Sequence, residues 1–454
     1  MFTFLLKLFI SVLILSVSFC HAESKPLSTK IPVIQVHAEK LSPLDIGLEI
    51  GRQSKLIFSD IEQRYDAYLL ASLSQMRFDD ILKNRLPELK RYVDSSYQKE
   101  LEGVASAWSL VHKNKLGDGF LSWDEYLLLN LLPDLVLPAN GTGFGVLDQV
   151  SKENSTIIGR NFDFTSTAEL RGLQTITVYD YKSRAVVNIG FAGIISVVTG
   201  FNESGLFVAH FNAAPDSSYQ NPFKVKQNVK QGTQAHVFAL RKALEVFNSA
   251  SQAINYFSKQ TYGVSSNTLV ADKKSIQVLE YSSSGKVEVR RWDSKVRANM
   301  RWGRKLQIAV VDCHALSDMT NNCRRAKDGY RWNHLRALAS FTSEKKSSVQ
   351  DISKIMLNNK NQYYEILGDD TIQSMIYLPD SGHLYLYAAP ISATEMPPSY
   401  QVYYQDLMPE SIRNPPRKRY FFWWVIGFLM FLAFVLWRVR ISMKAEEEIP
   451  KAEL

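Results

Sequence analysis

The stretch Gly159-Arg160-Asn161-Phe162-Asp163-Phe164 sets a basic, an amide and an acidic side chain directly after a predicted strand. It begins 17 residues after Thr142 of the segment Gly141-Thr142-Gly143-Phe144. Two further polar motifs border predicted strands: Gly200-Phe201-Asn202-Glu203-Ser204-Gly205-Leu206 before a strand that ends at Asn212, and Ser266-Asn267-Thr268-Leu269-Val270-Ala271-Asp272 at the start of another. Each motif alone is a weak signal. Their order and their spacing together carry the fold prediction.

The residues around these motifs change from helical to strand periodicity near Thr142. Between Asp45 and Leu135, apolar residues recur at the spacing of one helix face, which predicts helices. Beyond Thr142, short runs rich in β-branched and aromatic residues predict strands at 157–158, 173–181, 185–191, 194–199, 206–211, 268–271, 276–281, 287–290, 374–378 and 383–388. Helical spacing returns at 234–247 and 253–257. Helices before and between two groups of strands predict a layered domain in which consecutive strands pair as hairpins.

The motifs resemble those of the N-terminal-nucleophile amidases, the group of bile-salt hydrolase, acid ceramidase, N-acylethanolamine amidase and penicillin acyltransferase. The helical residues 23–140 resemble the prosegment of the acyltransferase branch, and Ile376–Leu386 resembles its closing hairpin. The resemblance implies an α+β fold, an αββα sandwich over residues 141–390. It also implies hydrolysis or transfer of an acyl group at the linear amide of a small acylated substrate.

The chemistry of this group has a physical logic that assigns roles to residues. The nucleophile is the first residue of a strand, exposed by self-cleavage, and its free amine serves as the general base. The resemblance implies that Arg160 favours the anionic nucleophile and that Asp163 orients the amine. The alternative for these two is a buried ion pair that stabilises the first hairpin.

The remaining site residues are implied in the same way. Asn212 and Asn267 match the donors to the oxyanion or substrate. Their alternative is a structural role as strand-end amides that cap a turn. Arg331 matches the late arginine of the group, and Arg336 matches it nearly as well.

The nucleophile position departs from the pattern. The group carries Cys before Thr-Gly or Thr-Ser, and Gly141 stands there in this chain. In one interpretation Thr142 is the nucleophile, because its hydroxyl can attack the Gly141 carbonyl and split the chain at that bond. In the other, the chain is an inactive relative that binds acylated ligands, since a shift of one residue turns a side chain to the other face of a strand. The sequence leaves both interpretations open.

The two ends of the chain have membrane-related patterns. Lys7, an apolar run and Cys20-His21-Ala22 predict a secretory signal peptide over residues 1–22. The uncharged apolar run Tyr420–Trp437, with aromatic residues near both ends, predicts one helix across a lipid bilayer. The Pro-rich residues 391–419 are predicted to form a stalk.

These ends predict a single-pass type I membrane protein. The ectodomain would lie in a periplasm or a lumen, and the tail 438–454 in the cytoplasm. The net charge is +8, and residues 411–454 contain eight Lys or Arg against four Glu, so half of the excess lies beside the predicted membrane segment. We therefore predict no nucleic-acid partner. The chain has no H-E-x-x-H, G-x-S-x-G or P-loop motif, and we predict no metal and no cofactor.

Two cysteines, Cys313 and Cys323, remain after removal of the signal peptide. In an oxidising compartment they can form a disulfide, and two free buried thiols are the alternative. The stretch Arg290–Lys305 mixes basic residues with Trp292 and Trp302. It is predicted to be a solvated face or a contact for acidic lipid headgroups.

Overall fold

A computed structural model describes most of the chain. The described residues are 31–110, 113–135, 138–165, 167–213, 233–319, 322–323, 326–359, 365–388, 400–403, 407–408, 412 and 429–440. They belong to two compact units, one within residues 1–409 and one within residues 410–454. The predicted signal peptide 1–22 and part of the predicted membrane helix lie outside the described residues.

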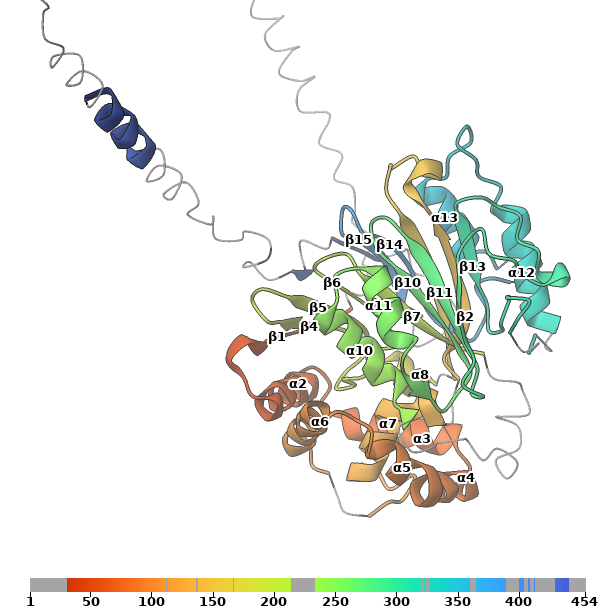
Figure 1. Cartoon of the computed structure of the whole chain (residues 1–454). Coiled ribbons are helices and arrows are strands. Elements are labelled where there is room, and N and C mark those ends of the chain that lie inside the picture. Colours follow the sequence, from red (N-terminus) through yellow and green to blue (C-terminus); the bar gives the residue numbers. More distant parts are fainter. Residues whose placement is uncertain are drawn as a thin grey trace, which may run out of the picture. The chain divides into compact units, whose positions relative to one another are not determined.

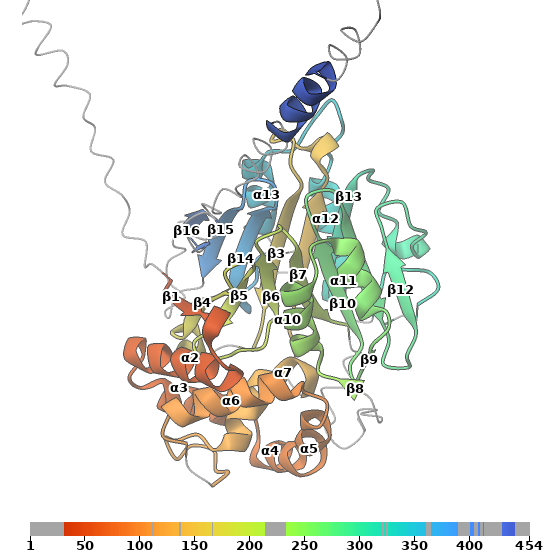
Figure 2. The ribbon, with the colours of Figure 1, turned by 60° about the vertical axis from the view of Figure 1, so that its left-hand side comes forward.

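Two β-sheets form the centre of the first unit (Figures 1 and 2). One sheet has the order β1 (Val33–His37), β4 (Gln174–Asp180), β5 (Ala185–Phe191), β6 (Thr199–Asn202), β7 (Phe207–Asn212), β10 (Ser266–Ala271), β11 (Ile276–Tyr281) and β12 (Val287–Arg290). The other has the order β13 (Gln307–Val310), β2 (Asn140–Val146), β3 (Ile157–Asp163), β14 (Thr371–Leu378), β15 (His383–Ala388) and β16 (Tyr400–Tyr403). A small parallel pair consists of β8 (Thr233–Gln234) and β9 (Thr261–Tyr262).

Helices cover both outer faces of the two sheets. The helices α10 (His236–Val246) and α11 (Ala250–Phe257) pack on the eight-stranded sheet, while α12 (Ala326–Leu338) and α13 (Val349–Met356) pack on the six-stranded sheet. Ser348 begins α13 with a capping box, in which it and Asp351 satisfy each other's backbone N–H. The αββα sandwich expected from the resemblance is confirmed.

The N-terminal helices gather at one end of the sandwich (Figures 1 and 2). They are α2 (Pro43–Ile57), α3 (Ile61–Ser72), α4 (Gln75–Asp80), the π-helical turn Ile81–Arg85, α5 (Leu86–Lys90), α6 (Ser95–Ala107) and α7 (Trp123–Leu135). A short helix α8 (Ala168–Arg171) packs against α3. The Ser42 side chain caps α2, and one continuous hydrophobic core joins these helices to the eight-stranded sheet. They are therefore part of the folded unit.

The two sheets approach each other closely at β2. An added Cβ at Gly143 would lie 3.0 Å from the Phe211 ring and 3.2 Å from Leu269, both on the opposite sheet. The Phe201 and Tyr377 rings stack across the interface with centroids 4.4 Å apart. A second core lies on the outer side of the six-stranded sheet and includes Phe144 of β2. Odd-numbered positions of β2 therefore face the other sheet, and even-numbered positions face α12 and α13.

Several elements differ from the sequence-based expectations. β1, β13, α12 and α13 were not predicted. The predicted strand 194–199 was wrong: the strand is β6, which begins at Thr199. Its neighbours Ile195 and Ser196 donate their backbone N–H groups to the Asn130 side chain of α7, at 2.9 and 3.3 Å. A side chain thus satisfies the groups that a strand would have given to a sheet.

The predicted stalk 391–419 was wrong in part. Residues Tyr400–Tyr403 form β16, which pairs with β15 at the edge of the six-stranded sheet. In the second unit, residues 429–440 are helical. Over the part of the chain that the structure describes, no helix is both long and apolar enough to span a bilayer. Most of the predicted tail 438–454 lies outside the described residues.

Candidate active site

The motif on β3 distributes its polar side chains to both faces of the six-stranded sheet. Arg160 reaches the other sheet, where its Nε donates to Thr199 Oγ1 at 2.7 Å and its Nη2 to the His210 carbonyl at 2.8 Å. Asn161 points the opposite way and donates to the Met356 carbonyl at the end of α13, at 2.7 Å. Asp163 shares the face of Asn161 because strand side chains alternate.

Arg160 is fully buried between the sheets. Its guanidinium lies over the rings of Phe162 and Phe211, at 4.8 and 4.4 Å from their centroids. Burial lowers the pKa of Arg160 to about 9, and the carboxylates of Asp163 and Asp312 oppose that shift. The guanidinium therefore stays positively charged at neutral pH.

Asp163 takes Arg331 of α12 as its ion-pair partner. Arg331 Nη1 lies 2.5 Å from Asp163 Oδ2, and the Thr371 hydroxyl donates to Asp163 Oδ1 at 2.5 Å. The expected alternative, an ion pair between Arg160 and Asp163, is not formed within the described residues. Of the two late arginines, Arg331 joins the cluster, whereas Arg336 is exposed and donates to the Trp302 carbonyl.

Gly141, at the predicted nucleophile position, lies on the inner face of β2. It is paired with Phe162 and precedes Gly143, which is paired with Arg160. Its φ of +142° lies in the region that favours glycine, and an added Cβ would lie only 1.9 Å from the Asn161 carbonyl oxygen and 3.1 Å from Arg160 Nη1. This backbone therefore accepts no side chain at the position beside Arg160.

Thr142 is paired with Asn161 and shares its outward face. Its side chain is fully buried, and its Oγ1 has no hydrogen-bond partner in the described part of the chain. The Thr142 hydroxyl and the Arg160 guanidinium thus lie on opposite faces of the sheet. The structure does not bring the predicted nucleophile and the predicted arginine together.

The two asparagines use their amides to hold backbone. The Asn212 side chain accepts from Ala139 N at 2.6 Å and donates to the Pro133 carbonyl at 3.1 Å, while Asn212 N donates to the Ala139 carbonyl at 2.8 Å. Asn267 Nδ2 donates to the carbonyls of Val311 and Cys313, at 2.9 and 2.8 Å. Asn212 therefore fixes the residues just before Gly141, and Asn267 fixes the backbone at Val311 and Cys313.

Asp312 is a site residue that the sequence did not predict. Its Oδ1 accepts a hydrogen bond from Gly141 N at 2.7 Å, and its side chain is buried. With Asp312, the charges around Gly141 become two arginines and two aspartates, all buried. The available signal was a single acidic residue after the apolar run Ile308–Val311, directly before Cys313.

His210 also lies in this region without having been predicted. It is buried, and its Nε2 lies 3.2 Å from Asn212 Oδ1. Burial, with the nearby positive charge of Arg160, lowers the pKa of His210 to about 3. The imidazole is therefore neutral at neutral pH.

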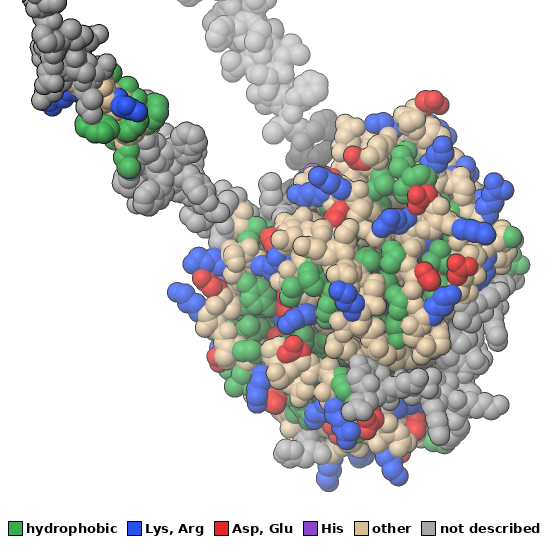
Figure 3. Space-filling model, in the orientation of Figure 1, with side chains coloured by type: hydrophobic (Ala, Val, Ile, Leu, Met, Phe, Trp, Pro, Cys, Tyr) green, Lys and Arg blue, Asp and Glu red, His purple; other side chains and the backbone are tan. Residues whose placement is uncertain are grey.

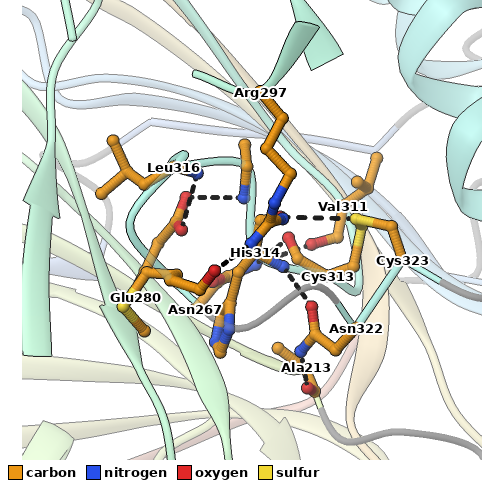
Figure 4. Close-up of a disulfide and its surroundings, with 12 residues drawn as sticks. Ala213, Asn267, Glu280, Arg297, Val311, Cys313, His314, Leu316, Asn322 and Cys323 are labelled. Carbon is orange, nitrogen blue, oxygen red and sulfur yellow. Dashed lines mark hydrogen bonds between the residues drawn. A yellow bond between two sulfur atoms is a disulfide. The ribbon is translucent and has the colours of Figure 1, made fainter. Parts of the chain in front are cut away.

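The cysteines form a disulfide, which confirms one of the two alternatives for them. Cys313 and Cys323 close a short loop with Cα atoms 5.0 Å apart. Figure 4 shows Asn322, a residue of this loop, and Asn267, which donates to the Cys313 carbonyl from β10. Asn322 accepts from His314 N at 2.8 Å and donates to the Ala213 carbonyl. The disulfide thus fixes the strand end that carries Asp312.

A small cavity of ≈ 40 Å³ lies between the N-terminal helices and the sandwich. Its lining is apolar or aromatic apart from Ser196, and comprises Tyr65, Tyr68, Leu129, Leu132, Pro133, Phe162, Phe164, Leu170, Phe191, Ile194, Ser196 and Val198. Phe162 both lines this cavity and pairs with Gly141 in the sheet. The cavity therefore adjoins the candidate site.

Comparison with known proteins places these features in context. A structure of the Caenorhabditis elegans N-acylethanolamine-hydrolyzing acid amidase ortholog is similar, with 15% identity, 52% of this chain and 92% of that chain covered, and a TM-score of 0.38. A penicillin V acylase from Agrobacterium tumefaciens is similar with 13% identity, 59% and 88% coverage, and a TM-score of 0.35. A mutant conjugated bile acid hydrolase from Clostridium perfringens is similar with 13% identity, 57% and 91% coverage, and a TM-score of 0.34. A search of curated proteins finds no significant match.

The family comparison is decisive for the classification. Residues 150–389, more than half of the 454-residue chain, match the acyl-coenzyme A:6-aminopenicillanic acid acyl-transferase family. The match contains the Arg160 and Asp163 motif and extends to the end of β15. It begins after Gly141 and Thr142. This chain belongs to the acyl-coenzyme A:6-aminopenicillanic acid acyl-transferase family.

Proposed function

We propose that this chain binds an acylated ligand at the family's site without cleaving the ligand's amide bond. The observation that carries the proposal is the lack of room for a side chain at Gly141, the predicted nucleophile position, which lies beside Arg160. Amide cleavage by this route needs a nucleophile on the same face as the arginine that stabilises its anion. Thr142 lies on the other face and is fully buried.

The apolar cavity beside Phe162 supports the proposal that the protein recognises the acyl chain of the ligand. The walls of the cavity are mostly hydrocarbon and aromatic rings, and the polar side-chain atoms among them are the hydroxyls of Tyr65, Tyr68 and Ser196. The Tyr65 hydroxyl donates to the Ala192 carbonyl at 2.6 Å. At ≈ 40 Å³ the cavity is too small for a long chain in this closed state. Binding of a long acyl chain therefore requires residues of this lining to move apart.

The proposal includes a membrane anchor. The signal peptide predicted at 1–22 and the apolar run Tyr420–Trp437 would hold the first unit outside the cytoplasm, with the tail 438–454 inside. The disulfide between Cys313 and Cys323 supports this placement because disulfides persist in oxidising compartments.

A second candidate function keeps the chain as an enzyme with Thr142 as nucleophile, hydrolysing or transferring the acyl group of a linear N-acyl amide. One observation favours it. The Thr142 hydroxyl is buried without a hydrogen-bond partner in the described residues, a situation that costs about 1–3 kcal/mol. In this mechanism Thr142 Oγ attacks the Gly141 carbonyl to form an ester, and water then hydrolyses the ester. The products are a Gly141 carboxylate and a free Thr142 amine.

Intact mass of the purified full chain separates the two functions. An uncut wild-type chain that binds but does not turn over an N-acyl amide supports the first. A break at Gly141–Thr142 that persists in Thr142→Ser and disappears in Thr142→Ala supports the second and contradicts the first.

Binding itself is tested at the cavity with two opposite changes at one residue. Val198→Phe should fill the cavity and weaken binding of a fluorescent N-acyl amide at least tenfold. Val198→Ala should enlarge it and keep or strengthen binding. If both variants bind like the wild type, the acyl chain does not enter this cavity.

A further inference from the structure

A large groove lies on the outer side of the six-stranded sheet, between the C-terminal end of α12 and α13. Its volume is ≈ 1000 Å³, at the upper end of the range for small-molecule sites. None of the residues that line it belongs to the cluster around Gly141. Any ligand here is therefore additional to the one proposed above.

The groove combines apolar and basic side chains. Its apolar lining comes from Leu338 at the end of α12, Phe341 after it, Ile355 of α13 and Leu357 directly after α13. Four lysines also line it: Lys152, Lys345, Lys346 and Lys354. Figure 3 shows Lys and Arg side chains among hydrophobic ones on the upper part of the molecule, the part in which Figure 1 places α13.

Two segments far apart in the sequence, one around Lys152 and one from Lys345 to Lys354, bring these lysines together. Lys152 belongs to the connection between β2 and β3, and its backbone N–H donates to the Ser347 carbonyl at 2.7 Å. Lys346 Nζ donates back to the Asn154 side chain of that connection at 3.2 Å. Lys354 is on α13. The backbone hydrogen bond between Lys152 and Ser347 joins the two segments, so the four lysines line one space from different parts of the chain.

The charges of the groove do not cancel. Four lysines face two carboxylates, those of Glu344 and Asp351, which leaves a formal excess of +2. The Asp351 carboxylate accepts from Ser348 Oγ at 2.7 Å and Ser348 N at 3.0 Å. These hydrogen bonds, with the charges of Lys152 and Lys354, lower the pKa of Asp351. Asp351 is thus occupied by its capping role, and the lysines retain capacity for an anion.

The basic stretch Arg290–Lys305 reaches the same end of α12. Arg304 donates to the Arg336 carbonyl at 3.1 Å, and Gln307 donates to the Phe341 carbonyl at 2.9 Å. Arg304 of this stretch therefore lies near the end of α12 that borders the groove, whereas Arg290 and Trp302 of the same stretch are buried. Long-range attraction of an anion to this side follows from the combined charge.

We propose that this groove binds an anionic amphiphile. Its hydrocarbon chain would lie along Phe341, Ile355 and Leu357, and its phosphate or carboxylate head among Lys152, Lys345 and Lys354. The methylene groups of the lysine side chains cover the ligand's hydrocarbon chain, while their ammonium groups contact its anionic head. The proposal does not depend on whether the Gly141 site is catalytic.

The test measures amine-reactive labelling of each lysine by mass spectrometry, on the full chain in phosphatidylcholine nanodiscs. Octyl phosphate should slow the labelling of Lys345 and Lys354 at least fivefold and leave Lys259, which is exposed just after α11, unchanged. Octanol and inorganic phosphate at the same concentration should each protect less than twofold. Equal protection by inorganic phosphate would reduce the groove to a simple anion site, and equal protection by octanol to an apolar one; either overturns the proposal.

Variants and a second lipid composition complete the test. Lys345→Glu/Lys354→Glu should weaken octyl phosphate binding at least tenfold by calorimetry, and Lys259→Glu should leave it unchanged. Unchanged binding in the double variant overturns the proposal, provided that its melting temperature matches the wild type. A further variant, Phe341→Ala, keeps the charges of the groove. It should weaken the binding of octyl phosphate and leave the binding of inorganic phosphate unchanged. Nanodiscs that contain phosphatidic acid distinguish the sources: protection without octyl phosphate identifies a membrane lipid as the amphiphile, and no protection identifies a soluble one.

Discussion

Replacing Asp163 by Asn removes one charge from a buried ion pair while nearly keeping the shape of the side chain. Asp163 and Arg331 are each about 1% exposed, and their nearest atoms are 2.5 Å apart. Removal of one partner of such a pair costs about 3–5 kcal/mol, because the other charge is left in the interior without compensation. The Asp370 carboxylate lies 4.0 Å from Arg331 Nη2 and compensates in part. We therefore expect Asp163→Asn to lower the free energy of unfolding by about 3 kcal/mol.

The assay is urea unfolding of the full chain in a mild detergent, followed by tryptophan fluorescence. Trp302 and Trp332 lie in the outer core of the same sheet and report its loss. Arg331→Met should cost a similar amount, and the double variant should cost less than the sum of the two, since no charge is then left unpaired. As a control, Lys99→Met breaks the exposed pair with Glu102 and should cost less than about 1 kcal/mol. Losses below about 1 kcal/mol for both Asp163→Asn and Arg331→Met would refute the reasoning.

Three further predictions concern the same region. Gly141→Ala should destabilise the fold by about 2–3 kcal/mol more than Gly285→Ala, because both glycines have positive φ but only Gly141 meets a carbonyl oxygen; equal losses in urea unfolding would contradict this. Burial lowers the pKa values of His210 and His236 in the folded protein. The free energy of unfolding should therefore be highest above pH 6.5 and should decrease as the pH drops from 6.5 toward 3, by up to about 1.4 kcal/mol per pH unit for each histidine. A His210→Gln variant should show a shallower fall in Tm over that range. Reduction of the disulfide, whose cysteines are 10 residues apart, should cost about 3 kcal/mol, and a Cys313→Ala/Cys323→Ala variant should be insensitive to reductant.

Local periodicity predicted most of the eight-stranded sheet. Its longer strands have six or seven residues in which apolar and polar side chains alternate or apolar side chains follow one another. β13 and α12 lacked that signal. β13 is the four-residue segment Gln307–Val310 next to a basic stretch, and α12 contains few apolar residues, with Trp332 and Leu335 as its fully buried apolar side chains. β13 pairs with β2, and α12 packs on β13. Sequence periodicity does not encode these tertiary contacts.

In the candidate site, too, local motifs were predictable from the sequence and contacts between distant segments were not. Arg160 and Asp163 were identifiable from one motif, but the partner of Asp163 comes from α12, 168 residues later. Asp312 reaches Gly141 only because β13 pairs with β2. The strand register also decides which face Thr142 occupies, and a motif read along the chain does not contain that information.

The strand β1 has a consequence for a cut of the chain between Gly141 and Thr142, near the start of β2. β1 lies N-terminal to such a cut, yet it pairs in parallel with β4, which lies C-terminal to it. Tyr65 and Tyr126 likewise donate to the carbonyls of Ala192 and Gly193 across the same boundary, at 2.6 and 2.9 Å. Two fragments would therefore remain one particle in gel filtration and on native gels, and would separate only in denaturant. A cleaved and an uncleaved chain would look alike in every measurement that preserves the fold.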